Sequence, residues 1–253
     1  MPASRGASLR LKDLMTPAML VSHAKKFIYL KTAKTAGTSV EAALQPLCMP
    51  PGAEVFHATP ESETEFGIVG ARQDYAPGSR WFNHMSAALL AKELPAEIWT
   101  GYRRICAIRN PWDKVVSFFH FTNPTLASTD AETVIPAFRA WLNQPGVQLG
   151  MDHHIYTIKR VPVIDTWLRF SHLEADLSAL CTELDVPTPP LPRFKAGMRP
   201  PGMTWQAYYD DAGREIVRKA FAPVIEMFGW QPDHADPARL PSAGDRVWPL
   251  KAE

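Results

Sequence analysis

Residues 27–44 read FIYLKTAKTAGTSVEAAL and decide the fold class of this chain. The first four are apolar strand formers, whereas Val40, Ala43 and Leu44 recur at the spacing of one helix face. A polar stretch of small residues joins the two parts. The order strand, loop, helix is typical of a repeating unit of an α/β domain.

A second unit of the same kind begins at Arg104. Residues 105–108 form a short apolar run that predicts a buried strand. Asn110 is a good helix N-cap, Pro111 suits the first helical position, and Asp113 suits the first turn. The strand and helix order therefore occurs at least twice.

Apolar patterns, helix caps, glycines and prolines in the rest of the chain predict further elements. We expect a helix at 86–94, strands at 161–164 and 167–170, a helix opened by a capping box of Ser171 and Glu174, and a closing helix at 212–228 that ends near Gly229. Prolines and glycines interrupt residues 50–78, so we expect this segment to wrap the sheet without long elements.

Alternating strands and helices predict a three-layer α/β fold with a mostly parallel central sheet flanked by helices. Ligands of such sheets bind at the carboxyl ends of the strands. With 253 residues, one domain spanning 1–253 is expected, with 1–25 as an N-terminal extension.

The charges nearly cancel, because 27 basic and 26 acidic residues give a formal net charge of +1. No global field favours nucleic acid or an anionic membrane, so an anionic ligand needs a local site. Cys48, Cys106 and Cys181 are far apart in apolar stretches, which favours free thiols in a reducing compartment. The N-terminal stretch has no long apolar run, so we expect a cytoplasmic protein without membrane insertion.

The segment 34–39, KTAGTS, lies between the first strand and its helix, where backbone N–H groups face an anion. Gly37 allows close approach of the backbone, Thr38 and Ser39 add hydroxyl donors, and Lys34 adds a mobile positive charge. The alternative interpretation is an ordinary strand-to-helix turn with Thr and Ser as N-caps.

Arg109 follows the second strand, and Ser117 lies about two turns into the next helix. A guanidinium fork there suits a terminal phosphate. The alternatives are an arginine paired with a core carboxylate and a serine tolerated within a helix.

Together, KTAGTS and RNPWDKVVS (109–117) resemble the two donor-binding motifs of sulfotransferases that use 3′-phosphoadenosine 5′-phosphosulfate (PAPS), most closely the carbohydrate-type and bacterial branch. Lys114 replaces the arginine usual in that motif. The resemblance implies a P-loop NTPase-like sulfotransferase fold, PAPS as donor, no catalytic metal, and transfer of a sulfuryl group to a hydroxyl of a carbohydrate or other small hydroxylated metabolite.

The resemblance also implies roles for particular residues. Lys34 would contact the 5′-phosphosulfate and its bridging oxygen, and Arg109 with Ser117 would hold the 3′-phosphate. The cradle of the phosphosulfate would be lined by Thr35, Ala36, Gly37, Thr38 and Ser39. Arg193 and Lys195, in a proline-rich segment, would close over the donor, although solvated loop charges are the alternative.

Histidine suits the task of removing the proton of the acceptor, because its ordinary pKa of roughly 6.5 lies near working pH. His84 holds the place where relatives carry a candidate base; its alternative role is structural, at a helix entry. His153 and His154 follow Asp152, which could orient one of them as a base; alternatively, they touch the substrate or a metal. Trp81 is a candidate for stacking on the acceptor. The histidine spacings predict no metal site.

Two rival functions remain open. A kinase-like phosphotransferase shares the strand, anion loop and helix, but it needs a lysine after the glycine, and Val40 follows Ser39 instead. A noncatalytic protein that binds adenosine phosphates would keep both motifs without the transfer chemistry.

Overall fold

The computed structural model describes residues 19–55, 59–72, 75, 77–82, 84–126, 129–147, 149–192 and 199–245. The strands are β1 (Leu20–Ser22), β2 (Phe27–Leu30), β3 (Ser62–Thr64), β4 (Gly67–Val69), β5 (Arg103–Ile108), β6 (Thr157–Ile158), β7 (Val161–Pro162) and β8 (Thr166–Arg169). The helices are α1 (Gly37–Leu44), α2 (Ala87–Glu93), α3 (Ala96–Gly101), α4 (Pro111–Thr122), α5 (Ala131–Leu142), α6 (Leu173–Glu183), α7 (Asp211–Ala220) and α8 (Ala222–Phe228).

The central sheet has six strands in the order β3-β4-β1-β2-β5-β8. β5 pairs in parallel with β2 on one side and with β8 on the other, as expected for an α/β sheet. The pairings of β1 with β2, β1 with β4 and β3 with β4 are antiparallel. The sheet is therefore mixed, and the predicted parallel arrangement holds for the half that carries the loop 31–36 and Arg109.

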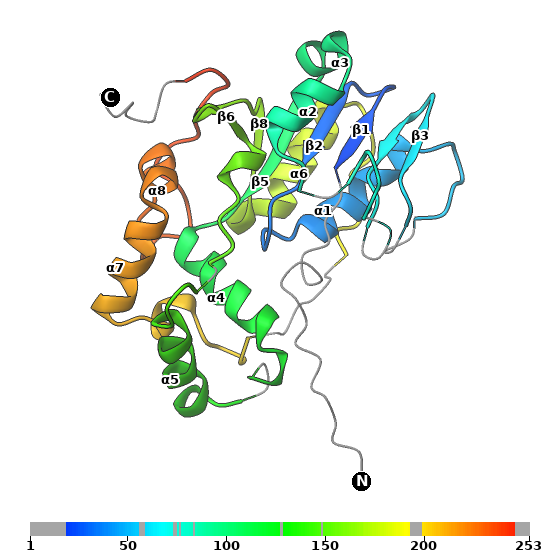
Figure 1. Ribbon diagram of the computed structural model, residues 1–253. Helices are drawn as coiled ribbons and strands as arrows, with labels where there is room; N and C mark the ends of the chain where they lie inside the picture. Colours follow the sequence, from blue (N-terminus) through cyan, green and yellow to red (C-terminus); the bar gives the residue numbers. More distant parts are fainter. Residues whose placement is uncertain are drawn as a thin grey trace.

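Both faces of this sheet are buried, which gives the expected three layers. Successive side chains of a strand point to opposite faces. Phe27 and Tyr29 belong to one apolar core with helices α1 and α6, whereas Ile28 and Leu30 belong to the other with α2, α4, α5, α7 and α8. Figure 1 shows α4, α5, α7 and α8 gathered beyond the β5–β8 side of the sheet, with β3 at the opposite end.

Several predicted helix boundaries are confirmed. Ser86 caps α2 by accepting from the Leu89 amide at 3.2 Å. Asn110 caps α4, where its Oδ1 accepts from the amide of Trp112 at 2.9 Å. Gly229 ends α8 in the left-handed conformation that glycine adopts without strain.

Other predicted boundaries are wrong. Ser171 does not cap a helix, because its hydroxyl donates to Asp236 at 2.5 Å and α6 begins only at Leu173. The closing helix divides into α7 and α8 at Phe221, since Pro223 follows and has no N–H to continue the α7 ladder.

Three segments differ from the expectation for other reasons. β1 (Leu20–Ser22) lies within the predicted extension 1–25, so the folded part of the chain includes residues before position 25. The segment 50–78 adds the hairpin β3–β4 to the sheet instead of wrapping it. No helix is predicted at α5, which Asp130 caps by accepting from the Thr133 amide at 2.8 Å.

Candidate anion-binding site

The loop 31–36 and Arg109 lie side by side at the carboxyl ends of β2 and β5. Because these two strands are parallel neighbours, their following segments emerge at the same edge of the sheet. The Thr32 hydroxyl donates to the Ala107 carbonyl at 2.5 Å and ties the loop to β5. The topology thus brings together two motifs that are separated by about seventy residues of sequence.

The loop backbone has an unusual conformation. Lys34 and Ala36 have φ of 60° and 57°, in the left-handed region that residues with a side chain rarely adopt. Left-handed residues that alternate with ordinary ones turn successive N–H groups to one side and form a concave anion site. Such strained conformations cluster at functional sites.

The same N–H groups continue into the first turn of α1. Its N-cap, Ala36, provides no side-chain hydrogen bond, and the first turn contains no acidic residue. The first amides of a helix carry partial positive charge and need partners. An anion is the natural partner at this helix end.

Three consecutive residues of the loop are tied to other parts of the chain. Besides the bond of Thr32, the Ala33 amide donates to Asp152 Oδ2 at 2.7 Å, and the Lys34 carbonyl accepts from Arg109 Nη1 at 2.9 Å. The Lys34 ammonium lies 4.1 Å from the centre of the Phe121 ring. The backbone of Lys34 is held, and its charge lies over α4.

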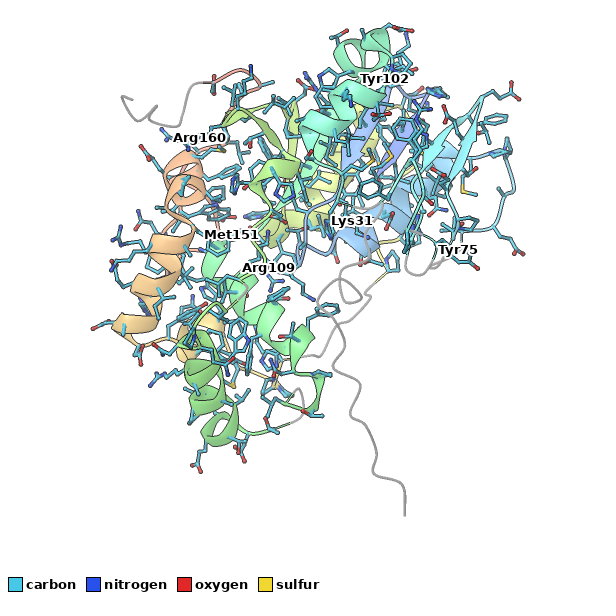
Figure 2. The ribbon with its side chains drawn as sticks, in the orientation of Figure 1. Lys31, Tyr75, Tyr102, Arg109, Met151 and Arg160 are labelled. Atoms are coloured by element: carbon cyan, nitrogen blue, oxygen red, sulfur yellow. The ribbon has the colours of Figure 1, made fainter. Side chains whose placement is uncertain are left out.

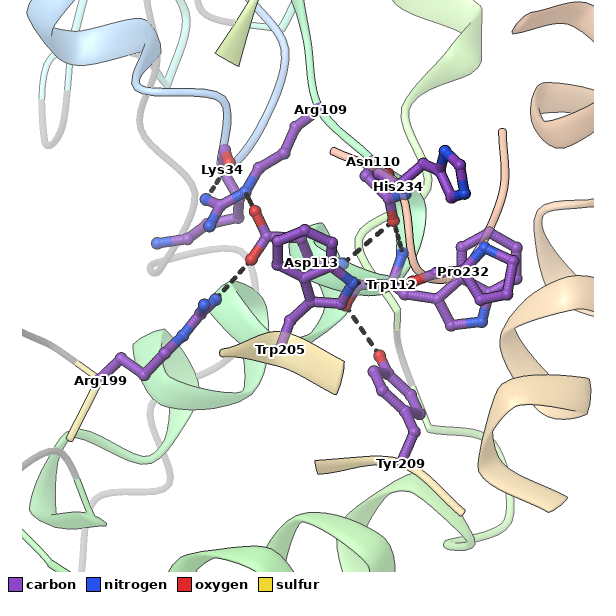
Figure 3. A network of polar contacts seen from close by, with 10 residues as sticks. All are labelled: Lys34, Arg109, Asn110, Trp112, Asp113, Arg199, Trp205, Tyr209, Pro232 and His234. Atoms are coloured by element: carbon purple, nitrogen blue, oxygen red, sulfur yellow. Dashed lines mark hydrogen bonds and ion pairs between the residues drawn. The ribbon is translucent and has the colours of Figure 1, made fainter. Parts of the chain in front are cut away.

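Arg109 is nearly buried and has partners on three sides. Its Nε donates to Asp113 at 2.6 Å, and its guanidinium lies 3.8 Å from the centre of the Phe170 ring. Arg199 donates to the other oxygen of Asp113 at 2.5 Å, as Figure 3 shows. Arg109 therefore pairs with a buried carboxylate, as in the alternative interpretation of this arginine.

The positive charges around Asp113 affect the pKa of its carboxyl more strongly than burial does. Burial alone raises the pKa of the Asp113 carboxyl, but Arg109 and Arg199 together hold that pKa below its usual range.

Nη2 of Arg109 has no partner among the residues that the structure describes. Ser117 is half-buried one helical turn after Asp113, with Phe121 one turn further, so α4 turns these three residues toward the loop.

The hydroxyl groups of the loop divide into two sets. Thr35 is buried and its hydroxyl contacts Thr32, at 2.9 Å from the hydroxyl and 3.2 Å from the carbonyl. The Thr35 hydroxyl is therefore held within the loop. Thr38 is half-buried, and Ser39 is buried in the first turn of α1.

A buried ionic network lies beneath the loop. Lys31 donates to Glu41 at 2.6 Å, and Arg72 lies 3.0 Å from the other oxygen of Glu41. A Cβ atom on Gly37 would lie 2.7 Å from Cγ of Lys31. Gly37 is thus needed to admit the Lys31 side chain, a reason that the sequence did not reveal.

His84 is attached directly to the loop. Its φ is 53°, and its Nδ1 lies 3.0 Å from the Lys31 carbonyl, so Nδ1 carries the proton and Nε2 keeps its lone pair. Burial lowers the pKa of His84 to about 3, opposed by the carboxylate of Asp152. The ring is neutral at neutral pH. Lys31 and Arg109, both labelled in Figure 2, are also largely buried, with side chains that are 5% and 9% exposed.

Asp152 does not orient a histidine, which corrects one prediction. Its two oxygens contact Ala33 and Lys114, and the three contacting groups are buried. His153 is half-buried and His154 is exposed, and their ring centres lie 6.3 Å apart. Both histidines stay candidates for the base or for contact with a substrate.

Trp81 belongs to the core. The side chain is 2% exposed, and its indole N–H donates to Glu63 at 2.7 Å. A ring so covered is not available to stack on a substrate in this conformation. Arg193 and Lys195 lie outside the described residues, whereas Arg199, six residues after Arg193, reaches the site and was not predicted.

A small pocket opens beside the loop. About 20 Å³ of it admits the centre of a water molecule, enough for about one water. Its polar lining is Thr32, Thr35, Arg109, Lys114, Asp152 and Tyr156, and α8 with Trp230 provides an apolar wall.

No protein-family model, curated protein or solved structure matches this chain. Within the described part of the chain, no helix has the length and apolar character to cross a membrane. The same residues contain no group of three or more His, Cys, Asp or Glu side chains arranged to hold a metal ion.

Proposed function

We propose that this chain is a sulfotransferase that moves a sulfuryl group from PAPS to a hydroxyl of a carbohydrate or another small hydroxylated acceptor. One observation carries the proposal. The Lys34 carbonyl accepts from Arg109 at 2.9 Å, so the two motifs that resemble the 5′-phosphosulfate and 3′-phosphate sites form one continuous site. The resemblance itself rests on KTAGTS and RNPWDKVVS.

The charge of the site supports an anionic ligand. The cationic side chains beside the loop are Lys34, Arg109 and Arg199, and Asp113 is paired with both arginines. A donor with a phosphosulfate and a second phosphate supplies the opposite charge.

On this proposal the loop and α1 hold the phosphosulfate. The donors are the backbone N–H groups of 35–38, the hydroxyls of Thr38 and Ser39, and the Lys34 ammonium, whereas the Ser39 amide donates to the Ala36 carbonyl at 2.8 Å. A loop whose donors already point at the ligand does not reorganise when charge develops, which is the largest common source of catalysis. The left-handed Lys34 and Ala36 keep the loop in that form.

Arg109 and Ser117 bind the 3′-phosphate on this proposal, and Arg199 adds a further positive charge. Nη2 of Arg109 remains for the ligand while Nε holds Asp113. Arginine forks bind phosphate with two parallel hydrogen bonds, which fixes orientation as well as charge. Phe170 supports the flat face of the guanidinium.

In the transfer itself, the bond between sulfur and the bridging phosphate oxygen breaks while the acceptor oxygen bonds to sulfur. Lys34 stabilises the negative charge that develops on the leaving phosphate. His84 accepts the acceptor proton at Nε2, which is unprotonated at neutral pH because the pKa of the ring is about 3. Such a weak base contributes less than one whose pKa lies near 7.

That low pKa favours a second candidate function. A protein that binds adenosine phosphates without transferring a group needs the loop and Arg109 but no base. The two functions differ in turnover and not in donor binding. A radiolabelled PAPS assay over a panel of hydroxylated acceptors separates them once binding is established.

Thermal unfolding with 3′-phosphoadenosine 5′-phosphate tests the binding step. With chelator present and the ligand at 100 times its dissociation constant, we expect about 2.7 kcal/mol of added stability. ATP with magnesium, run in parallel, is expected to add less. Stabilisation by ATP and magnesium alone assigns the site to a kinase-like phosphotransferase, and no stabilisation by either ligand contradicts the proposal.

A further inference from the structure

Asp152 places a negative charge beside a loop that is built for anions. The residue comes just before the short 3₁₀ helix η5 (His153–Ile155) and is 5% exposed. Its Oδ2 accepts from the Ala33 amide at 2.7 Å, and its Oδ1 pairs with the Lys114 ammonium. An unpaired carboxylate at this position would repel an anionic ligand and weaken its binding. Asp152 therefore needs a positive counter-charge nearby.

Lys114 supplies the neutralisation. It lies on α4, one residue after Asp113, and its ammonium is as buried as the carboxylate that it contacts. Removing one member of a buried pair leaves an uncompensated charge, whereas replacing both is often nearly neutral for stability. The charge of Asp152 is therefore balanced, and its remaining role is its hydrogen bond to the loop.

That hydrogen bond lies next to the strained part of the loop. Ala33 immediately precedes Lys34, whose left-handed backbone is strained for a residue with a side chain and persists only when neighbouring contacts hold it. The bonds of Thr32 and Lys34 both reach β5 or its end. Of the hydrogen bonds made by Thr32, Ala33 and Lys34, the bond from Ala33 to Asp152 is the one whose partner lies in another segment.

We propose that Asp152, with Lys114 as its counter-charge, is a positioning residue that holds the loop 31–36 in the conformation that receives the anion. The identity of that anion rests on the function proposed above. The segment that carries Asp152 also carries His153 and His154 on its surface side, so the donor loop is attached to the segment with the candidate acceptor contacts.

Three variants test this role. Asp152→Ala removes the acceptor for the Ala33 amide. Asp152→Asn combined with Lys114→Met restores an acceptor oxygen and removes both charges. Asp165→Ala is the matched control, because Asp165 also accepts from a backbone amide, that of Arg104 at 2.8 Å, and pairs with a cation, but at the opposite end of β5.

Two measurements are compared across the variants: the affinity for 3′-phosphoadenosine 5′-phosphate by calorimetry, and amide hydrogen exchange of 33–36. We expect Asp152→Ala to weaken binding about tenfold or more and to speed exchange in the loop, since a hydrogen bond to a charged group is lost. The double variant is expected to bind within about threefold of the unmodified protein, and Asp165→Ala to match it in both measurements.

Wild-type affinity together with wild-type loop exchange in Asp152→Ala overturns the proposal. Equal effects of Asp152→Ala and Asp165→Ala on the loop also overturn it, because the change is then a general loss of stability. If the unmodified protein binds no bisphosphate, the proposed function fails. The exchange data still decide the role of Asp152, since loop exchange that rises only in Asp152→Ala supports it.

Discussion

Arg109 Nη1 donates to the carbonyl of Lys34 at 2.9 Å, across 75 positions of sequence. The bond joins the end of β5 to the loop that follows β2, and it holds a residue whose φ is 60°. The same guanidinium is shared with Asp113. Arg109 is thus both a candidate ligand group and a support of the loop conformation.

Replacing Lys34 by alanine is expected to lower the rate of sulfuryl transfer by about 100-fold or more, because a donor aimed at developing charge is removed. The bisphosphate should still bind, since the backbone cradle remains. Initial rates with labelled PAPS measure the effect. Lys25→Ala is the control, because its ammonium donates to the Asp185 carbonyl at 3.0 Å in an exposed contact. A wild-type rate in Lys34→Ala contradicts the assignment.

Arg109→Ala should weaken binding of 3′-phosphoadenosine 5′-phosphate by about 2–5 kcal/mol, as expected when one partner of a desolvated charge pair is removed. Titration calorimetry measures this loss. Arg103→Ala tests the same change at the other end of β5, where the arginine pairs with Glu183 at the surface. Equal affinities of Arg109→Ala and the unmodified protein remove Arg109 from the site.

Gly37→Ala is expected to lower the free energy of unfolding by about 1–3 kcal/mol, because the added Cβ overpacks a filled space. The new atom would lie 2.7 Å from Cγ of Lys31 and 3.2 Å from the Thr32 carbonyl. Urea unfolding measures the difference. Gly101→Ala serves as control, since a Cβ at Gly101 meets nothing within 4 Å. Similar results for both glycines refute this account of Gly37.

Stability should fall as pH decreases from about 6.5 to 4.5, because two buried histidines resist protonation. Burial lowers the pKa of His84 to about 3 and that of His120 to about 4. In this window the unfolded chain binds more protons than the folded one, so the free energy of unfolding falls as the pH is lowered. Urea unfolding at several pH values measures the slope.

The variant His120→Gln should flatten that slope, since the buried ring that contacts the Tyr208 hydroxyl at 2.7 Å no longer titrates. His154→Gln replaces an exposed ring and serves as its control. An unchanged slope in His120→Gln shows that another group causes the acid sensitivity.

The local elements around the site were predictable from the sequence. The apolar run at 27–30 and the helical spacing after it indicated β2 and α1, and Asn110 with Pro111 marked the start of α4. These signals act over a few residues, through strand propensity, periodicity and capping. They also indicated that the two strands bring Lys34 and Arg109 to one edge of the sheet.

The partners of the site residues were not predictable in the same way. Asp152 is 119 positions from Ala33, Arg199 is 86 positions from Asp113, and neither has a local signal that names its partner. The antiparallel half of the sheet was missed because its strands are three residues long and lie among glycines and prolines.

The sequence by itself therefore determined the strand-loop-helix units, because short-range backbone preferences encode them, and it supplied the residue types of the candidate anion site directly. Only the tertiary structure decided that Asp152 and Lys114 hold the loop, that Asp113 occupies Arg109, and that Gly37 admits Lys31. Those contacts depend on which buried charges meet when distant segments pack, and a buried charge takes the partner that packing brings to it.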